Sequence, residues 1–234
     1  MPSNEKILCI IPARGGSKSI PYKNIILLNK KPLIFYTIQQ SLRIKEITKI
    51  IVSSDSQKII SKIQKFEKYK KFQIIKRPKK YATAKSTTED VISHTLQLLK
   101  IKNFIPDKIL LLEPTSPLRK DITVKKFIRC MSNKKFKSFL SVKEISHVPA
   151  IIDYKNRFNF LLKNQPRRRQ DRKKLYCEGG SMYGINYETF INKKTILVQH
   201  IFPFIINKLE SFDINEPEDI VIVDSLLKNK KKSW

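Results

Sequence analysis

One stretch decides the expected fold: Ile7–Asn24, which reads ILCIIPARGGSKSIPYKN. Its apolar beginning, Ile7–Ile11, is typical of a buried parallel β-strand. The residues that follow include two glycines, three cations and hydroxyl groups. Glycine lets backbone amides approach an anion closely, and the cations neutralise it. We therefore expect a nucleoside triphosphate at this loop. The alternative is a Gly-Gly turn with solvated lysines, because lysine is abundant throughout the chain.

The bulk properties indicate one globular α/β domain that spans 1–234. Of the 234 residues, 41% are hydrophobic, an ordinary share for a soluble protein. No apolar run approaches the roughly 20 residues of a membrane-spanning helix. No secretory signal precedes the first strand, so we expect a cytoplasmic protein with no membrane partner. The lysine-dense segment 228–234 is expected to be a frayed basic tail.

The formal net charge is +28, which suggests a nucleic-acid or membrane-surface protein. The lysines, however, are spread through every segment beside abundant isoleucine and asparagine, as AT-rich coding sequence favours. The chain also lacks an RNP-like aromatic pattern, a GXXG clamp and a basic recognition helix. We therefore expect no specific nucleic-acid partner. The excess charge would still attract anionic nucleotides and acidic sugars.

Strand-like and helix-like segments alternate after the loop, which predicts a mainly parallel, doubly wound, Rossmann-like α/β sheet. The carboxyl ends of such strands share one edge, where ligands bind. Residues 143–175 break the alternation and suggest a long surface loop. Residues expected at the shared edge are Arg14, Asp55, Arg77 and Glu113. Expected strands are Ile47–Val52, Phe72–Ile75, Ile109–Leu112 and Ser138–Val142; expected helices are Lys31–Leu42, Ser56–Phe66, Thr87–Leu99 and Asp121–Cys130.

The glycine-containing loop closely resembles the signature of the acylneuraminate cytidylyltransferase family, a strand followed by (I/L)-P-A-R-x-x-S-K-x-(I/L)-P-x-K-N. The family contains synthetases of CMP-sialic acid and CMP-legionaminic acid. The resemblance implies a nucleotide-diphospho-sugar transferase-like fold. It also implies transfer of CMP from CTP to an acidic nonulosonic sugar with Mg²⁺, in a homodimer that serves cell-surface glycan synthesis. Arg14 and Lys23 would be catalytic. Implied nucleotide contacts here are Ala13, Arg14, Gly15, Gly16, Ser17, Lys18, Lys23 and Asn24.

Two further motifs match the family in order. The stretch RPKKYA resembles an element in which Arg77 and Ala82 would recognise the cytosine, although Arg77 alone could equally be a surface charge. The family often has an aspartate where this chain has Ala84. The stretch LEPTSPLR carries Glu113 where the sialic acid enzymes commonly have a glutamine that faces the sugar. Glu113 would bind sugar hydroxyls or Mg²⁺, unless it only stabilises the turn.

The stretch PRRRQD and the later YCEGGSMY, which begins at Tyr176, resemble the R-R-Q and Y-x-x-N-G-x-x-Y elements that line the family's sugar pocket. They imply sugar contacts from Arg168, Gln170 and Tyr183, with solvated loop arginines as the alternative. Gly179 stands where the family usually has asparagine, so one side-chain amide is lost. In the family, the region that corresponds to 143–175 is an excursion that builds the homodimer and covers the partner's site.

The stretch ESFDINEPED resembles the element that holds the catalytic Mg²⁺. It implies metal binding and a catalytic role for Asp213, with Asn215 where the family has a second aspartate. Without the resemblance, Asn215 would be the N-cap of a helix over Glu216–Lys228. Three rival functions remain: a CMP-Kdo type enzyme, a GTP-using relative, and a basic RNA-binding protein that has lost catalysis.

Overall fold

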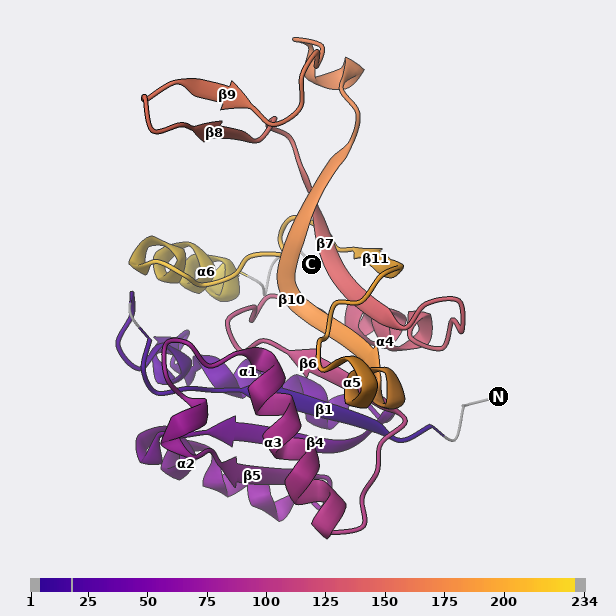
Figure 1. Ribbon diagram of the computed structural model, residues 1–234. Coiled ribbons are helices and arrows are strands. Elements are labelled where there is room, and N and C mark those ends of the chain that lie inside the picture. Colours follow the sequence, from indigo (N-terminus) through magenta and orange to yellow (C-terminus); the bar gives the residue numbers. More distant parts are fainter. Residues whose placement is uncertain (1–4, 18, 230–234) are drawn as a thin grey trace.

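The computed structural model describes residues 5–17 and 19–229 (Figure 1). Lys18 and residues 230–234, most of the predicted basic tail, lie outside the described residues. The core is a seven-stranded sheet in the order β11-β7-β10-β6-β1-β4-β5. Within the described part of this sheet, β10 is antiparallel to both neighbours and all other pairs are parallel. The strands of this sheet are β1 (Ile7–Pro12), β4 (Ile47–Ser54), β5 (Phe72–Lys76), β6 (Lys108–Leu112), β7 (Ser138–Ile145), β10 (Leu175–Asn186) and β11 (Ile201–Ile205).

Helices cover both faces of the sheet, so the predicted doubly wound architecture is confirmed. Successive side chains of β1 point to opposite faces. Ile7, Cys9 and Ile11 pack with α1, α2 and α4, whereas Leu8 and Ile10 pack with α3 and α5. The helices are α1 (Leu33–Arg43), α2 (Gln57–Ile63), α3 (Thr88–Ile101), α4 (Asp121–Cys130), α5 (Tyr187–Lys193) and α6 (Pro217–Asn229).

The predicted elements of the first half form with small shifts at their ends. The start of α3 could be predicted from sequence because it carries a capping box. The Thr87 hydroxyl accepts from the Asp90 amide, and the Asp90 carboxylate accepts from the Thr87 amide. The second half contains β10, α5 and β11, which were not expected. None of the helices in the described residues is long and apolar enough to cross a bilayer.

An arm projects from the layered body where β7 and β10 run beyond the sheet (Figure 1). Its end is an antiparallel hairpin of β8 (Ala150–Ile152) and β9 (Phe158–Phe160), while β2 (Leu27–Leu28) and β3 (Lys31–Pro32) pair near α1. The arm occupies most of 143–175, which is therefore partly ordered as strands. Its apolar side chains are exposed, with Tyr154 at 89% and Ile152 at 70%. Such clustering of exposed apolar groups is typical of an interaction surface.

A buried arginine beyond β6 ties the layers together. Arg119 donates to the Gln40 side chain of α1 at 2.9 Å and to the Thr37 hydroxyl at 3.0 Å. It also donates to the carbonyl oxygens of Ser181 in β10, at 2.9 Å, and of Glu113, at 3.2 Å. Burial lowers the pKa of Arg119 to about 10. One side chain thus connects a helix, the end of β6 and the neighbouring strand.

We predict that Arg119→Met lowers the free energy of unfolding by about 3 kcal/mol or more, because several buried acceptors lose their donor at once. The matched control is Arg43→Met. Arg43 pairs with Asp121 at 2.7 Å but has a 58% exposed side chain, so its loss costs less than about 1 kcal/mol. Urea denaturation of both variants measures the difference. Equal losses would contradict the role assigned to Arg119.

Candidate active site

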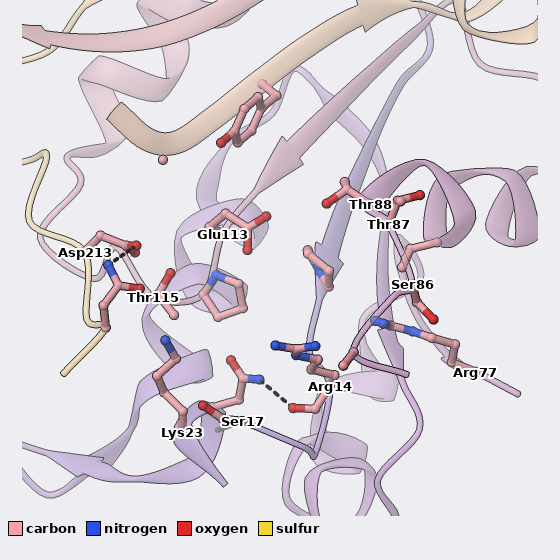
Figure 2. Close-up of a pocket in the computed structure, with 18 residues that line it drawn as sticks. Arg14, Ser17, Lys23, Arg77, Ser86, Thr87, Thr88, Glu113, Thr115 and Asp213 are labelled. Atoms are coloured by element: carbon pink, nitrogen blue, oxygen red, sulfur yellow. Dashed lines mark hydrogen bonds between the residues drawn. The ribbon is translucent and has the colours of Figure 1, made fainter. Parts of the chain in front are cut away.

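A cavity of about 500 Å³ lies at the carboxyl edge of the parallel strands. Its walls come from the loops after β1, β5 and β6, the start of α3, the middle of β10 and the segment before α6. Figure 2 shows Asp213 and Arg77 on opposite sides of this space, with Arg14 and Glu113 between them. Nine residues predicted from sequence line it: Arg14, Ser17, Lys23, Asn24, Arg77, Glu113, Tyr183, Asp213 and Asn215.

The remaining predicted site residues lie elsewhere. Ala13 is buried beneath the loop, and its amide donates to the Ser53 carbonyl at 2.9 Å. Gly15 and Gly16 lie between the cavity residues Arg14 and Ser17, but neither they nor Ala82 line the cavity. Arg168 and Gln170 belong to the arm, so a single chain does not bring them to this cavity. Lys18 lies outside the described residues.

The loop after β1 is held against the loop after β4. The Gly15 amide donates to the Asp55 carboxylate at 2.9 Å. A Cβ on Gly15 would stand 2.7 Å from the Ser56 Cβ, so no larger residue fits without movement. A Cβ on Gly16, in contrast, would meet nothing within 4 Å. Asn24 closes the loop from within, because its side-chain amide donates to the Arg14 carbonyl at 3.0 Å (Figure 2).

We predict that Gly15→Ala weakens nucleotide binding by about tenfold or more, since overpacking of this kind costs roughly 1–3 kcal/mol and displaces Arg14. Gly16→Ala is the matched control and leaves binding nearly unchanged. A nucleotide titration followed by calorimetry compares the two. A second variant, Gly15→Ala with Ser56→Gly, removes the clash and restores binding. Equal behaviour of the two single variants would refute the packing argument.

Hydroxyl groups at the start of α3 form one wall that the sequence analysis did not assign to the site. Ser86, Thr87 and Thr88 all line the cavity (Figure 2). The Thr87 hydroxyl already caps the helix, whereas a helix start also presents backbone amides and favours negative charge. The signal for these residues was available, because the predicted cap falls directly after a loop at the ligand-binding edge.

Arg77 is buried and serves the framework as well as the cavity. Its guanidinium donates to the Ser53 hydroxyl at 3.1 Å and to the Ser53 carbonyl at 2.6 Å. Burial lowers the pKa of Arg77, which the nearby Asp55 charge opposes. It thus joins the loop after β5 to the end of β4. Recognition of a base by Arg77 and Ala82 stays a prediction.

Two carboxylates occupy the opposite part of the cavity. Burial raises the pKa of Glu113 to about 7, and the Asp213 charge adds to that effect, while Arg119, Lys23 and Arg77 oppose it. Asp213 accepts from the Ser116 hydroxyl at 3.3 Å and from the Asn215 side-chain amide at 3.0 Å. The Lys23 ammonium donates to the Ile214 carbonyl at 2.7 Å. A cation from the first loop is thus fixed beside the segment that carries Asp213.

The alternative role of Asn215 as a helix N-cap is wrong. Its side chain points to Asp213, and the Asp219 carboxylate instead accepts from the amides of Asn215, at 2.8 Å, and Glu216, at 2.9 Å. A residue inside the helix therefore binds the amides that precede it. Sequence could not separate these two arrangements, because both use short polar side chains at the same helix start.

The Gly179-Gly180 pair has a structural reason. A Cβ on Gly179 would stand 2.8 Å from the Ser141 carbonyl oxygen in β7, and Gly180 has a φ of +62°. Both lie in an irregular section of β10 where the register against β7 shifts. Asparagine at position 179 therefore requires movement of the β7 backbone in this chain. The missing amide follows from close packing of two strands.

The raised pKa of Glu113 predicts a pH-dependent stability difference for Glu113→Gln without metal or ligand. The folded wild type binds an extra proton between about pH 4.5 and pH 7, so its stability falls as the pH rises through that range. The variant avoids this loss and gains up to about 3 kcal/mol above pH 7. Urea denaturation from pH 4 to pH 8 checks it. Glu144→Gln, at an exposed position, is the control, and a parallel trend there would contradict the prediction.

The fold and the cavity define a nucleotide-binding α/β protein, with a cationic glycine-containing loop after the first strand and two carboxylates facing it. The sequence model of the cytidylyltransferase family matches residues 8–228. The chain belongs to this family and is therefore a nucleotidyltransferase. The family assignment made from the loop motif is confirmed.

Several relatives resemble the chain over most of its length. It is 32% identical to the CMP-N,N'-diacetyllegionaminic acid synthase of Legionella pneumophila, over 95% of this chain and 96% of that protein. It is 30% identical to the pseudaminic acid cytidylyltransferase of Campylobacter jejuni, over 97% of this chain and 99% of that protein. It is 28% identical to the N-acylneuraminate cytidylyltransferase of Streptococcus agalactiae over 93% of the chain, which spans about half, 52%, of that relative.

The fold is also similar to that of a solved structure, a CMP:2-keto-3-deoxy-manno-octonic acid synthetase complexed with CTP. The TM-score is 0.71, with 96% of this chain and 99% of that chain covered and 15% sequence identity. At this identity the likeness shows the fold alone. The predicted fold class is confirmed.

Proposed function

We propose that this cytidylyltransferase activates an acidic nine-carbon 2-keto sugar with CTP, giving the CMP-sugar and pyrophosphate. The observation that carries the proposal is that Arg14, Lys23, Glu113 and Asp213, from three separate parts of the sequence, line one cavity. The names of full-length relatives with 30% and 32% identity support a nonulosonic acid as the acceptor.

In the proposed reaction, the anomeric hydroxyl of the sugar attacks the α-phosphorus in line. A bond forms between that oxygen and phosphorus, the bond to the β-phosphate oxygen breaks, and the hydroxyl proton is released. Arg14 and Lys23 bind the triphosphate and stabilise charge that develops on the leaving pyrophosphate. Ser17 and the loop amides donate hydrogen bonds, and Asn24 holds Arg14 in place through its carbonyl. Positioning and charge stabilisation account for most of the catalysis.

The donor set of the cavity fits Mg²⁺. Two carboxylates, Glu113 and Asp213, face the cavity, with the amide oxygen of Asn215 beside them. Among the described residues no group of three or more His, Cys, Asp and Glu side chains could hold a metal. Mg²⁺ commonly takes only one or two carboxylates and completes its shell with water and substrate phosphates. Asp213 and Asn215, with Glu113, would hold the ion, which would neutralise phosphate oxygens when bound.

We extend the proposal to a cytoplasmic homodimer that supplies cell-surface glycan synthesis. The exposed apolar side chains of the hairpin support a second copy as the partner of the arm. In such a dimer, Arg168 and Gln170 would reach a partner's cavity, where guanidinium groups suit the carboxylate of an acidic sugar. Glu113 and Tyr183 would contact the sugar from the chain's own cavity.

Pyrophosphate release with Mg²⁺ tests the function directly. We expect release with CTP and one nine-carbon sugar, from a panel of four nucleoside triphosphates and several acidic 2-keto sugars. Arg14→Ala should lower turnover at least 100-fold while the unfolding temperature stays unchanged, because it removes charge stabilisation rather than packing. Lys58→Ala, which removes an exposed cation that does not line the cavity, is the control.

Other outcomes would identify a rival function. Activity with an eight-carbon sugar or with GTP would change the substrate. Absence of CTP binding, together with RNA binding that persists at physiological salt, would replace the enzyme with a nucleic-acid-binding protein. Near-normal turnover of Arg14→Ala would refute the assigned site.

A further inference from the structure

One hydrogen bond on the sugar side of the cavity involves a residue that the motifs do not assign. The Tyr183 hydroxyl lines the cavity and donates to the Glu178 carboxylate. These residues are five apart in β10, and in a regular strand they would point to opposite faces. Glu178 pairs with Val142 but Tyr183 pairs with Leu140, so three extra residues bulge out between them. The irregular section of β10 therefore brings the two side chains together.

The hydrogen bond fixes what Tyr183 offers to a ligand. A phenol has one proton, and here that proton is directed to Glu178. The hydroxyl oxygen can then only accept a hydrogen bond from the cavity. Burial raises the pKa of Tyr183, and the Glu178 bond and the charges of Glu113 and Asp213 raise it further, so the proton stays on the phenol.

The groups around Tyr183 also favour a hydrogen-bond donor on the ligand. Asp213 lines the same cavity and presents only acceptor oxygens, and one N–H of the Asn215 side-chain amide is bonded to it. Where no cation stands between them, the negative charges nearby also oppose an anion at this point, because like charges repel more strongly in a partly buried site. A group that donates a hydrogen bond is therefore favoured next to Tyr183, and a carboxylate is disfavoured.

We propose that Glu178 is a positioning residue for sugar specificity: it turns the Tyr183 hydroxyl into an acceptor that selects a hydroxyl or acylamino N–H on the bound sugar. The inference rests on the proposed function in assuming that a sugar occupies this part of the cavity. The Tyr183 hydroxyl, fixed as an acceptor, also orients that sugar, since the sugar carboxylate must lie away from Tyr183. Glu178 acts only through Tyr183 and need not touch the substrate.

Three variants and a control test the inference by pyrophosphate release with CTP and the sugar that the wild type accepts. Glu178→Leu frees the phenol to rotate and should raise the sugar KM about tenfold, with the CTP KM unchanged. Tyr183→Phe should do the same, and the double variant should be no worse than either. Glu178→Gln keeps an acceptor for the phenol and should stay near wild type. Tyr69→Phe, at an exposed tyrosine before β5 that does not line the cavity, is the control.

Substrate analogues sharpen the test. Among monodeoxy and O-methyl analogues of the sugar, one should have a KM about tenfold higher than that of the sugar itself with the wild type. With Tyr183→Phe, the same analogue should show no further increase in KM. Equal changes in both KM values and kcat, or a change only in the unfolding temperature, would mean that the bond merely stabilises the bulge and would overturn the proposal.

The test separates this proposal from the function on which it rests. If the wild type releases no pyrophosphate with any sugar, the proposed reaction fails. Sugar binding is then measured by calorimetry with the same nonulosonic acids in the presence of CTP. If sugar binding is weaker in Glu178→Leu, while CTP binding is unchanged, and is normal in Glu178→Gln, the specificity role is supported even then. Unchanged binding, or no binding of any sugar, overturns it.

Discussion

The guanidinium of Arg119 is the interaction on which the rest of the active cavity depends. It contacts α1, the end of β6 and β10, so the two segments that carry Glu113 and Tyr183 meet α1 at one buried cation. Glu113 follows β6 directly, and its backbone carbonyl is one of the acceptors. Tyr183 follows Ser181, another acceptor, by two residues. The position of the acidic wall is thus fixed by a side chain that lies beneath it and does not line the cavity.

The cavity divides its charges in a way that suits two different ligands. Cations come from the loop after β1 and the loop after β5, and the carboxylates of Glu113 and Asp213 come from the segments after β6 and before α6. A triphosphate is attracted to the first group and is kept from the second unless a cation stands between them. The +28 net charge of the whole chain adds a long-range attraction that does not distinguish one anion from another. Local geometry, and not total charge, therefore determines where each ligand binds.

Much of the fold could be predicted from sequence because local signals agreed with it. The apolar runs of β1 and β6 and the capping box at Thr87 depend on neighbours in the sequence. The antiparallel strand β10 was not predicted, since its Gly179-Gly180 pair and its bulge interrupt the period of two. The cavity edge was predicted from strand ends. Arg119 and Glu178 were not assigned, because their roles depend on partners distant in the sequence or on a local irregularity of a strand. Ser86 was not assigned although its place beside the predicted helix cap at the cavity edge was a usable signal.

The contact at Gly179 constrains how this chain can evolve. An asparagine there would press its Cβ against the Ser141 carbonyl, so a single codon change towards the family's usual residue meets a steric barrier. Ser141 also uses its hydroxyl to accept from the Met182 amide at 2.9 Å, which binds β7 and β10 together at the same place. Replacement of Gly179 therefore becomes tolerable only after the β7 backbone has shifted.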